Sequence, residues 1–352
     1  MGETRVVDAS DRSIELAVRV LRAGHLVALP TETVYGLAAD ASNPEAVARV
    51  FSAKGRPADH PLIVHLGPGA DLAGWARHVP EQAARLGGAF WPGPLTMVLE
   101  RQPSVLDAVT GGQDTVALRK PSHPVAQRIL DAFGGGLAAP SANRFGRVSP
   151  TTARHVRDGL AGDVGLIVDG GTCEVGVEST IVAFEGDDVV ILRPGGVTPE
   201  AIARALGRRA RRAARSKVRA PGMLASHYAP ATPLALASPD EAAARAARLA
   251  SLGRRVGVLA LERAEVPGVA ATWDAGGDVT VLARSLYRYL READAEGLDV
   301  LVVALPPDEG LGVAIRDRLG RAAQRSMPGP PDPDHGGPGP SRRLRTSDGR
   351  HR

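Results

Sequence analysis

The side chains with the clearest chemical potential lie between Pro30 and Pro61. The apolar residues 26–29 predict a buried strand that Pro30 ends, and hydroxyl, carboxyl and phenol groups then crowd residues 31–35. Open α/β sheets place their ligands at strand ends of this kind. The segment therefore predicts part of a binding site.

A Lys-x-Arg pair follows in the same segment. Apolar spacing from Pro44 predicts a helix that Gly55 ends, which places Lys54 and Arg56 at its C-terminus. Arg offers a planar fork of donors and Lys a compact charge, so the pair suits an anion with several oxygens. Only three of the 43 basic side chains are lysines, which makes Lys54 notable. A solvated lysine that favours the helix dipole is the plainer alternative.

A second hydroxyl-rich stretch spans residues 139–152. Its small polar groups Ser141, Asn143 and Ser149 are of the kind that wraps an anion or a nucleotide. The alternative is a surface loop whose polar groups satisfy their own turns and cap the next helix. Further polar side chains stand at or near the ends of predicted strands, namely His65, Arg119 and Arg193, and Ser179 ends the loop that leads into the strand 181–184.

Hydrophobic periodicity predicts the elements that position these residues. The first group comprises helices 11–22, 44–54, 83–89, 124–133, 152–160 and 198–206 and strands 26–29, 62–66, 95–99, 115–119, 137–139, 166–169, 181–184 and 189–192. The second comprises strands 234–237, 256–261 and 300–304 and helices 240–252, 282–292 and 311–324. Alternation in the second group predicts a small three-layer parallel sheet.

Composition is that of a globular chain, with 43% apolar and 23% charged residues and a net charge of +4. The mildly basic balance permits anionic ligands without establishing nucleic-acid binding. The single cysteine, Cys173, excludes an internal disulfide, and no run approaches the ~20 apolar residues of a membrane span, so we expect a cytoplasmic protein. Phosphate-loop, dinucleotide-fingerprint and zinc-ligand spacings are absent from the sequence.

Between the two groups, residues 207–231 predict an interdomain linker with an arginine-rich first half. A solvated charged face and an RNA contact are both compatible with these arginines. The tract from His227 to Pro230 suggests docking on another surface. Residues 327–352, rich in Pro and Gly, predict a disordered tail.

Seven ordered motifs, PTETVYGLAADA, KGRPADHPLIVHL, WPGPLT, VALRKPSHP, APSANRFGRVSPTT, VGVESTIV and LRPGGVT, resemble the threonylcarbamoyl-AMP synthase family of the YrdC/Sua5 type. The resemblance covers about residues 10–206, and HYAP with the added α/β domain (232–326) is similar to the longer, Sua5-type members. It implies a YrdC-like twisted mixed sheet with helices around a concave cavity. A smaller Rossmann-like three-layer α/β C-terminal domain would follow.

The resemblance also implies site residues. The family signature falls on Lys54, Arg56, Ser141 and Asn143 as catalytic residues. L-Threonine would be held by Thr33, His65, Arg119 and Ser179. ATP would be held by Arg56, His60, Thr115, Ala139, Ser141, Ser149 and Arg193, with Tyr228 closing over the nucleotide. The family commonly has Asn at the position of His60, so a neutral contact becomes titratable here.

The implied reaction joins L-threonine, bicarbonate or CO₂, and ATP to give threonylcarbamoyl-AMP and pyrophosphate, for modification of adenosine 37 in tRNAs reading ANN codons. We expect Mg²⁺ to accompany ATP, no metal ligated by the protein, and a downstream tRNA threonylcarbamoyl transferase as partner. Two alternatives are a carbamoyl-transfer enzyme of the hydrogenase-maturation kind and a non-catalytic double-stranded RNA-binding module. The absence of zinc-finger cysteines disfavours the first.

Overall fold

The computed structural model describes residues 3–212, 218–222 and 227–324, so the predicted tail lies outside the described residues. The strands of the first sheet are β1 (Arg5–Val7), β2 (Val27–Leu29), β3 (Gly36–Asp40), β4 (Ile63–His65), β5 (Leu95–Glu100), β6 (Thr115–Arg119), β7 (Leu137–Ala138), β8 (Leu166–Val168), β9 (Thr180–Glu185), β10 (Asp188–Arg193) and β11 (Arg211–Arg212). They form one mixed sheet in the order β1-β8-β2-β3-β7-β4-β6-β5-β9-β10-β11.

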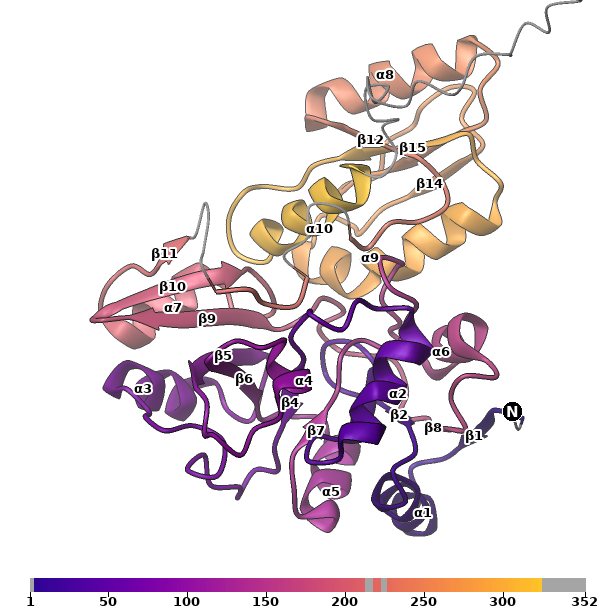
Figure 1. Cartoon of the computed structure of the whole chain (residues 1–352). Coiled ribbons are helices and arrows are strands. Elements are labelled where there is room, and N and C mark those ends of the chain that lie inside the picture. The colour runs from indigo at the N-terminus through magenta and orange to yellow at the C-terminus, as the bar shows by residue number, and fades with distance from the viewer. Residues whose placement is uncertain (1–2, 213–217, 223–226, 325–352) are drawn as a thin grey trace, which may run out of the picture.

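Helices cover this sheet on two sides (Figure 1). They are α1 (Asp11–Arg22), α2 (Pro44–Lys54), α3 (Glu81–Phe90), α4 (Asp107–Thr110), α5 (Pro124–Phe133), α6 (Ala153–Leu160) and α7 (Pro199–Leu206). Strand alternation separates the two sides: Val27 and Leu29 pack with α1 and α5, whereas Ala28 packs with α2 and α6. The helix predicted to stop at Gly55 does so, because Gly55 adopts the left-handed conformation of a C-cap.

The linker, rather than a helix, covers one part of the sheet. Ile63, Val98 and Ala117 form a small apolar cluster on β4, β5 and β6, and this cluster includes Ala220 with Val218 packed against it. A linker segment placed over the inner strands can therefore contribute to a site at their ends.

The second body of the molecule is a small parallel sheet between helices (Figure 1). Its strands are β12 (Leu234–Ala237), β13 (Val256–Leu259), β14 (Ala271–Trp273) and β15 (Val300–Ala304), in the order β12-β15-β13-β14. α8 (Pro239–Ser251) packs on one face, and α9 (Val279–Ala295) and α10 (Gly312–Gln324) pack on the other. The predicted three-layer parallel arrangement is confirmed.

The cluster that holds α9 and α10 also contains Val34, Val148 and Val177 of the first body. α9 and α10 therefore form the interface between the two bodies, and α8 lies on the outer side (Figure 1).

Some short strands were not predicted. β3 reads GLAAD, whose small residues have low strand propensity, and β1, β11 and β14 are only two or three residues long. β11 lies inside the segment predicted as linker and pairs with β10. Its arginines are ion-paired on the surface, Arg211 with Glu185 and Arg212 with Asp308. Every helix in the described part of the chain is too short or too polar to cross a membrane.

Candidate active site

One pocket gathers side chains from the ends of sequence-distant strands. It contains eight of the predicted site residues, namely Arg56, His65, Arg119, Ala139, Ser141, Ser179, Arg193 and Tyr228. Sheet geometry explains part of this convergence. β4 and β6 run parallel with His65 opposite Arg119, so both side chains leave the sheet at the same edge.

Arg119 is held in place by neighbouring groups. Its Nη1 donates to the Thr33 hydroxyl (2.9 Å), its Nε donates to the Gly93 carbonyl (3.3 Å), and its Nη2 forms an ion pair with Glu32 (2.7 Å). Arg119 and Glu32 are both buried, so water screens this pair weakly. Thr33 itself does not line the pocket; its position makes it a support for Arg119.

His65 lines the pocket with neither ring nitrogen hydrogen-bonded within the described residues. Burial, with Arg119 nearby, lowers the pKa of His65 well below its usual value. The ring is therefore neutral at pH 7, so one nitrogen carries a proton that it can donate to a ligand and the other can accept a hydrogen bond. Such a ring suits a ligand hydroxyl or amine.

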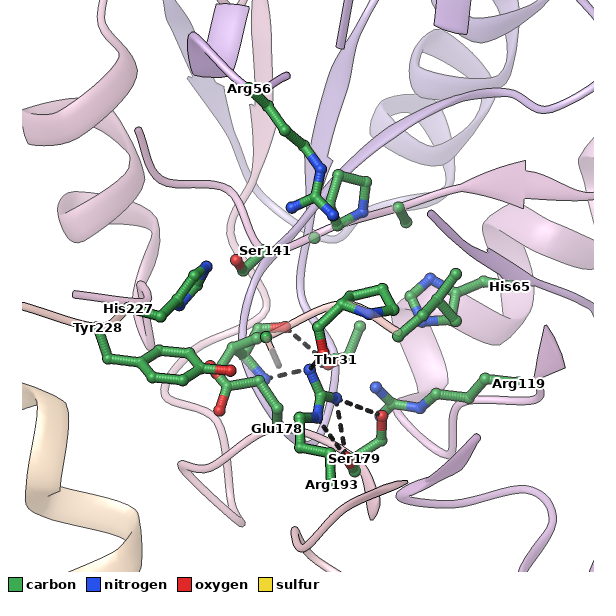
Figure 2. A pocket seen from close by; sticks show the side chains of 17 residues that line it. Thr31, Arg56, His65, Arg119, Ser141, Glu178, Ser179, Arg193, His227 and Tyr228 are labelled. Atoms are coloured by element: carbon green, nitrogen blue, oxygen red, sulfur yellow. Dashed lines mark hydrogen bonds between the residues drawn. The ribbon is translucent and has the colours of Figure 1, made fainter. Parts of the chain in front are cut away.

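Ser179 and Arg193 form a connected pair (Figure 2). Arg193 Nη2 donates to the Ser179 carbonyl (2.8 Å) and to the Ser179 hydroxyl (3.1 Å), and Nη1 donates to the Pro221 carbonyl in the linker (2.9 Å). The Ser179 hydroxyl also lies 2.7 Å from that of Thr96. Arg193 thus connects the linker, through Pro221, to Ser179 in the pocket.

Lys54 and Asn143 lie behind the pocket rather than in it. The buried Lys54 Nζ donates to the backbone carbonyls of Ser141 (2.5 Å) and Asn143 (2.6 Å). The Asn143 amide donates to the carbonyls of Arg144 and Arg147. Burial, with Arg56 nearby, lowers the pKa of Lys54 well below its usual value. The geometry therefore makes Lys54 a brace of the Ser141 loop, not the free phosphate ligand expected from the sequence.

Arg56 and His60 both contact the first ring in a series of aromatic contacts that continues through the linker to the second body. Arg56 lies over the Phe145 ring (5.7 Å), which also contacts His60 (5.4 Å between centroids) and His227 (5.9 Å). Burial lowers the pKa of Arg56 to about 10, so it is charged at neutral pH. His60 is part-buried and does not line the pocket, and its pKa is lowered by burial and by Arg56.

Two other predicted ATP ligands also lie outside the pocket. The Ser149 hydroxyl is buried and donates to Glu178 (2.7 Å). Thr115 lies at the opposite end of β6 from Arg119 and lines a separate hollow with Glu100 and Val218. The structure therefore does not bring Thr115 to the other predicted site residues.

The linker closes the pocket from one side, where His227 and Tyr228 point inward (Figure 2). Tyr228 is fully buried, with φ of 62°, a left-handed conformation that is unusual for a non-glycine residue. Position 222 accepts glycine because a Cβ atom there would collide with the Tyr228 hydroxyl and crowd the Arg193 guanidinium. The cavity that remains has a volume of about 40 Å³. Pockets for drug-sized ligands measure roughly 300–1,000 Å³, so a nucleotide requires displacement of this segment.

The charge of the pocket is positive. Arg56, Arg119 and Arg193 line it, and the one acidic lining residue, Glu178, is bonded to protein donors through both oxygens. Among residues 3–212, 218–222 and 227–324, no group of three or more His, Cys, Asp or Glu side chains could hold a metal ion. Buried Cys173 has its pKa raised to about 12 by burial, which makes it a poor nucleophile.

Reasoning from the sequence assigned no role to four side chains at or behind the pocket, namely Glu32, Glu178, Tyr287 and Arg318. A signal for one of them is present in α10. Arg318 occupies the apolar helical spacing set by Ile315, Leu319 and Ala322, where a charged residue needs a buried partner.

Two family models, several relatives and a solved structure match this chain. Residues 19–195 match the model of the Sua5/YciO/YrdC family, described as telomere recombination, and residues 197–324 match the threonylcarbamoyl-AMP synthase C-terminal domain. The threonylcarbamoyl-AMP synthases of Pyrococcus abyssi and Bacillus subtilis are 39% and 41% identical to this chain. Each alignment covers 91% of this chain, and the two cover 98% and 95% of the relatives' own lengths. The crystal structure of P. abyssi Sua5 complexed with L-threonine matches 92% of this chain and 98% of its own, with a TM-score of 0.86 and 37% identity.

Proposed function

Because the chain belongs to the Sua5/YrdC family of threonylcarbamoyl-AMP synthases, we propose that this pocket joins L-threonine, bicarbonate or CO₂, and ATP into threonylcarbamoyl-AMP and pyrophosphate, as a nucleotidyltransferase. The convergence of three arginines with Ser141 and Ser179 in one closed pocket carries the proposal. Guanidinium groups suit carboxylate and phosphate oxygens, and hydroxyl groups add short-range selectivity.

L-Threonine binds at the side of the pocket formed by His65, Arg119 and Ser179. The solved complex of the P. abyssi relative with L-threonine supports this substrate. Two of the five N–H groups of Arg119 donate to Gly93 and Thr33, and Nη2 is ion-paired with Glu32, so N–H groups remain to bind a carboxylate. His65, with a neutral ring, and Ser179, through its hydroxyl, both line the pocket and bind the amine and hydroxyl of the amino acid in this proposal.

ATP binds along Arg56, Ala139, Ser141 and Arg193, under Tyr228. Mg²⁺ would arrive with the nucleotide and offset phosphate charge, since the acidic side chains at the pocket are engaged: Glu178 accepts from Tyr287 and Arg318, and Glu32 pairs with Arg119 and accepts from the Ser122 amide. Thr115, Ser149 and His60 do not line the pocket in the conformation described, and their contact with the nucleotide stays a prediction.

The reaction proceeds in two steps. The threonine amine attacks the carbon of CO₂ and loses a proton, or attacks bicarbonate and releases water; either route gives a carbamate. A carbamate oxygen then attacks the α-phosphorus of ATP, forming the mixed anhydride and expelling pyrophosphate. The protein contributes position and charge rather than a covalent intermediate. Closure by the linker excludes water, which would hydrolyse both labile species.

The product serves modification of adenosine 37 in tRNAs reading ANN codons, through a downstream tRNA threonylcarbamoyl transferase. A weak tRNA contact through the arginine-rich stretch stays a prediction, and Arg208, Arg211 and Arg212 in its described part form surface ion pairs with Asp188, Glu185 and Asp308.

The test is pyrophosphate release from ATP by the full chain. We expect release that requires both L-threonine and bicarbonate and that falls strongly with valine, the isostere of threonine without its hydroxyl. Serine, which keeps the hydroxyl, gives an intermediate rate. Pyrophosphate release that is the same with and without threonine would refute the proposal, and RNA binding without any release would favour the non-catalytic alternative.

A further inference from the structure

Two polar side chains of the second body, Tyr287 from α9 and Arg318 from α10, lie directly behind the pocket and bond to its residue Glu178. Both are fully buried, and Arg318 is among the largest side chains in the described part of the chain with no solvent exposure. Charged side chains are almost never fully buried unless paired. Their partners therefore indicate what the second body does for the site.

The shared partner is Glu178. Arg318 Nε donates to Glu178 Oε2 (2.6 Å), and the Tyr287 hydroxyl lies 2.8 Å and 3.0 Å from the two carboxylate oxygens. Ser149 of the first body donates to Oε1 (2.7 Å). Glu178 thus has three side-chain donors, two of which come from the second body.

These contacts flank the pocket residues. Arg318 Nη2 also donates to the Pro194 carbonyl (2.9 Å). Glu178 precedes Ser179 and Pro194 follows Arg193, so one guanidinium fixes the neighbours of both members of the Ser179–Arg193 pair. The same guanidinium carbon lies 4.9 Å from the centre of the Tyr228 ring, which stacks near Tyr287 at 6.0 Å.

Electrostatics favour an ionised Glu178 in this arrangement. Burial raises the pKa of Glu178, but Arg318, Arg193 and the hydrogen bonds together lower it by more, so that the pKa is about 2. The carboxylate is therefore ionised at neutral pH inside the protein. Loss of one member of a buried pair leaves an uncompensated charge, so the geometry is strongly held.

We propose that Arg318 and Tyr287 are positioning residues for the synthase reaction: the second body fixes Ser179, Arg193 and Tyr228 through Glu178 and Pro194. This inference rests on the proposed function. It makes the C-terminal sheet and its helices part of the active site, although neither Arg318 nor Tyr287 lines the pocket.

A pair of tyrosines on α9 gives the matched test. Tyr287→Phe removes a hydroxyl whose hydrogen bonds within the described residues are to Glu178, and Tyr289→Phe removes one that bonds to the Asp274 carbonyl (2.7 Å), away from the pocket. We expect Tyr287→Phe to lower kcat/KM for threonine about tenfold, and Tyr289→Phe to leave it within about twofold. Unfolding midpoints of the two variants should agree within a few degrees.

Arg318→Lys and Arg318→Met separate position from stability. Lysine keeps the charge beside Glu178 but lacks the fork that reaches Pro194 and Asp317, so Arg318→Lys should lose less stability than Arg318→Met and still lose about tenfold in kcat/KM of the folded protein. Arg318→Met should lose both stability and activity, because Glu178 is left unpaired.

Wild-type threonine-dependent pyrophosphate release is the reference for all four variants, and its absence would refute the proposed function. With that activity present, full activity in both Tyr287→Phe and Arg318→Lys would overturn the positioning role. Loss of activity that only follows the unfolded fraction would also overturn it, since a purely structural residue behaves in that way.

Discussion

Lys54 offers a decisive test of what the signature lysine does. The structure directs its ammonium group to two backbone carbonyls, those of Ser141 and Asn143, at 2.5 Å and 2.6 Å. A hydrogen bond to a charged group contributes about 1.5–3 kcal/mol, so two contribute about 3–6 kcal/mol before the cost of burying the charge. Lys54→Met keeps the apolar stem and removes both bonds, for a net loss of about 3 kcal/mol.

That loss should appear without any ligand. At about 2–4 °C per kcal/mol, we expect the unfolding midpoint of Lys54→Met to fall by about 6–12 °C in calorimetry of the substrate-free protein. Lys120→Met is the matched control. Lys120 Nζ also donates to two carbonyls, those of Pro68 and Ala70, but it is part-exposed and water can replace it, so a loss of about 1 kcal/mol or less follows.

An unchanged midpoint of substrate-free Lys54→Met, with a raised KM for ATP, would refute this reasoning. It would assign Lys54 to phosphate, as the sequence alone suggests. An unfolding midpoint of Lys54→Met that falls only as much as that of Lys120→Met would also contradict the reasoning, because burial of the two Lys54 bonds would then add nothing to stability.

Two further predictions concern the charged groups of the pocket. Arg119→Lys should raise KM for threonine about tenfold and leave KM for ATP within about twofold, because lysine cannot replace the fork held by Glu32, Thr33 and Gly93; equal effects in steady-state assays would contradict the assignment. The pKa of Glu178 is about 2, below its ordinary 4.5, so its stabilisation is present above about pH 4.5 and is lost as pH falls toward 2, by about 3 kcal/mol. Urea midpoints should therefore fall less steeply over this range in Glu178→Gln/Arg318→Met than in wild type, whereas parallel curves would contradict the pKa.

The family resemblance predicted that His65, Arg119 and Arg193 share one site, and the fold gives a physical reason for it. Each follows an apolar run, and strand ends converge at a sheet edge whatever the side chains are. Thr115 shows the limit of such reasoning. It lies on the same strand as Arg119, but at its other end, and β6 separates the two by several residues of extended chain.

The partners of the buried charges were beyond sequence reasoning. Nothing local marks Ser141 and Asn143 as acceptors for Lys54, which is 87 and 89 residues away, and Arg318 meets Glu178 across 140 residues. Such pairs are set by how α2 and α10 pack, and packing follows from the whole chain. A basic residue at an apolar helical position, as for Arg318, predicts a buried partner but does not identify it.

The donors of the pocket are largely engaged before substrate binds, and this has a consequence for catalysis. Arg193 is fixed by Ser179 and Pro221, and Arg119 by Glu32, Thr33 and Gly93. A fork held by protein acceptors cannot turn to follow a ligand, so its remaining N–H groups point in set directions. The free energy of orienting these charges is then supplied by folding rather than by the reaction. Glu178 and Arg318 extend the same arrangement into the second body, so displacement of that body should disorient the donors even where no substrate contact is lost.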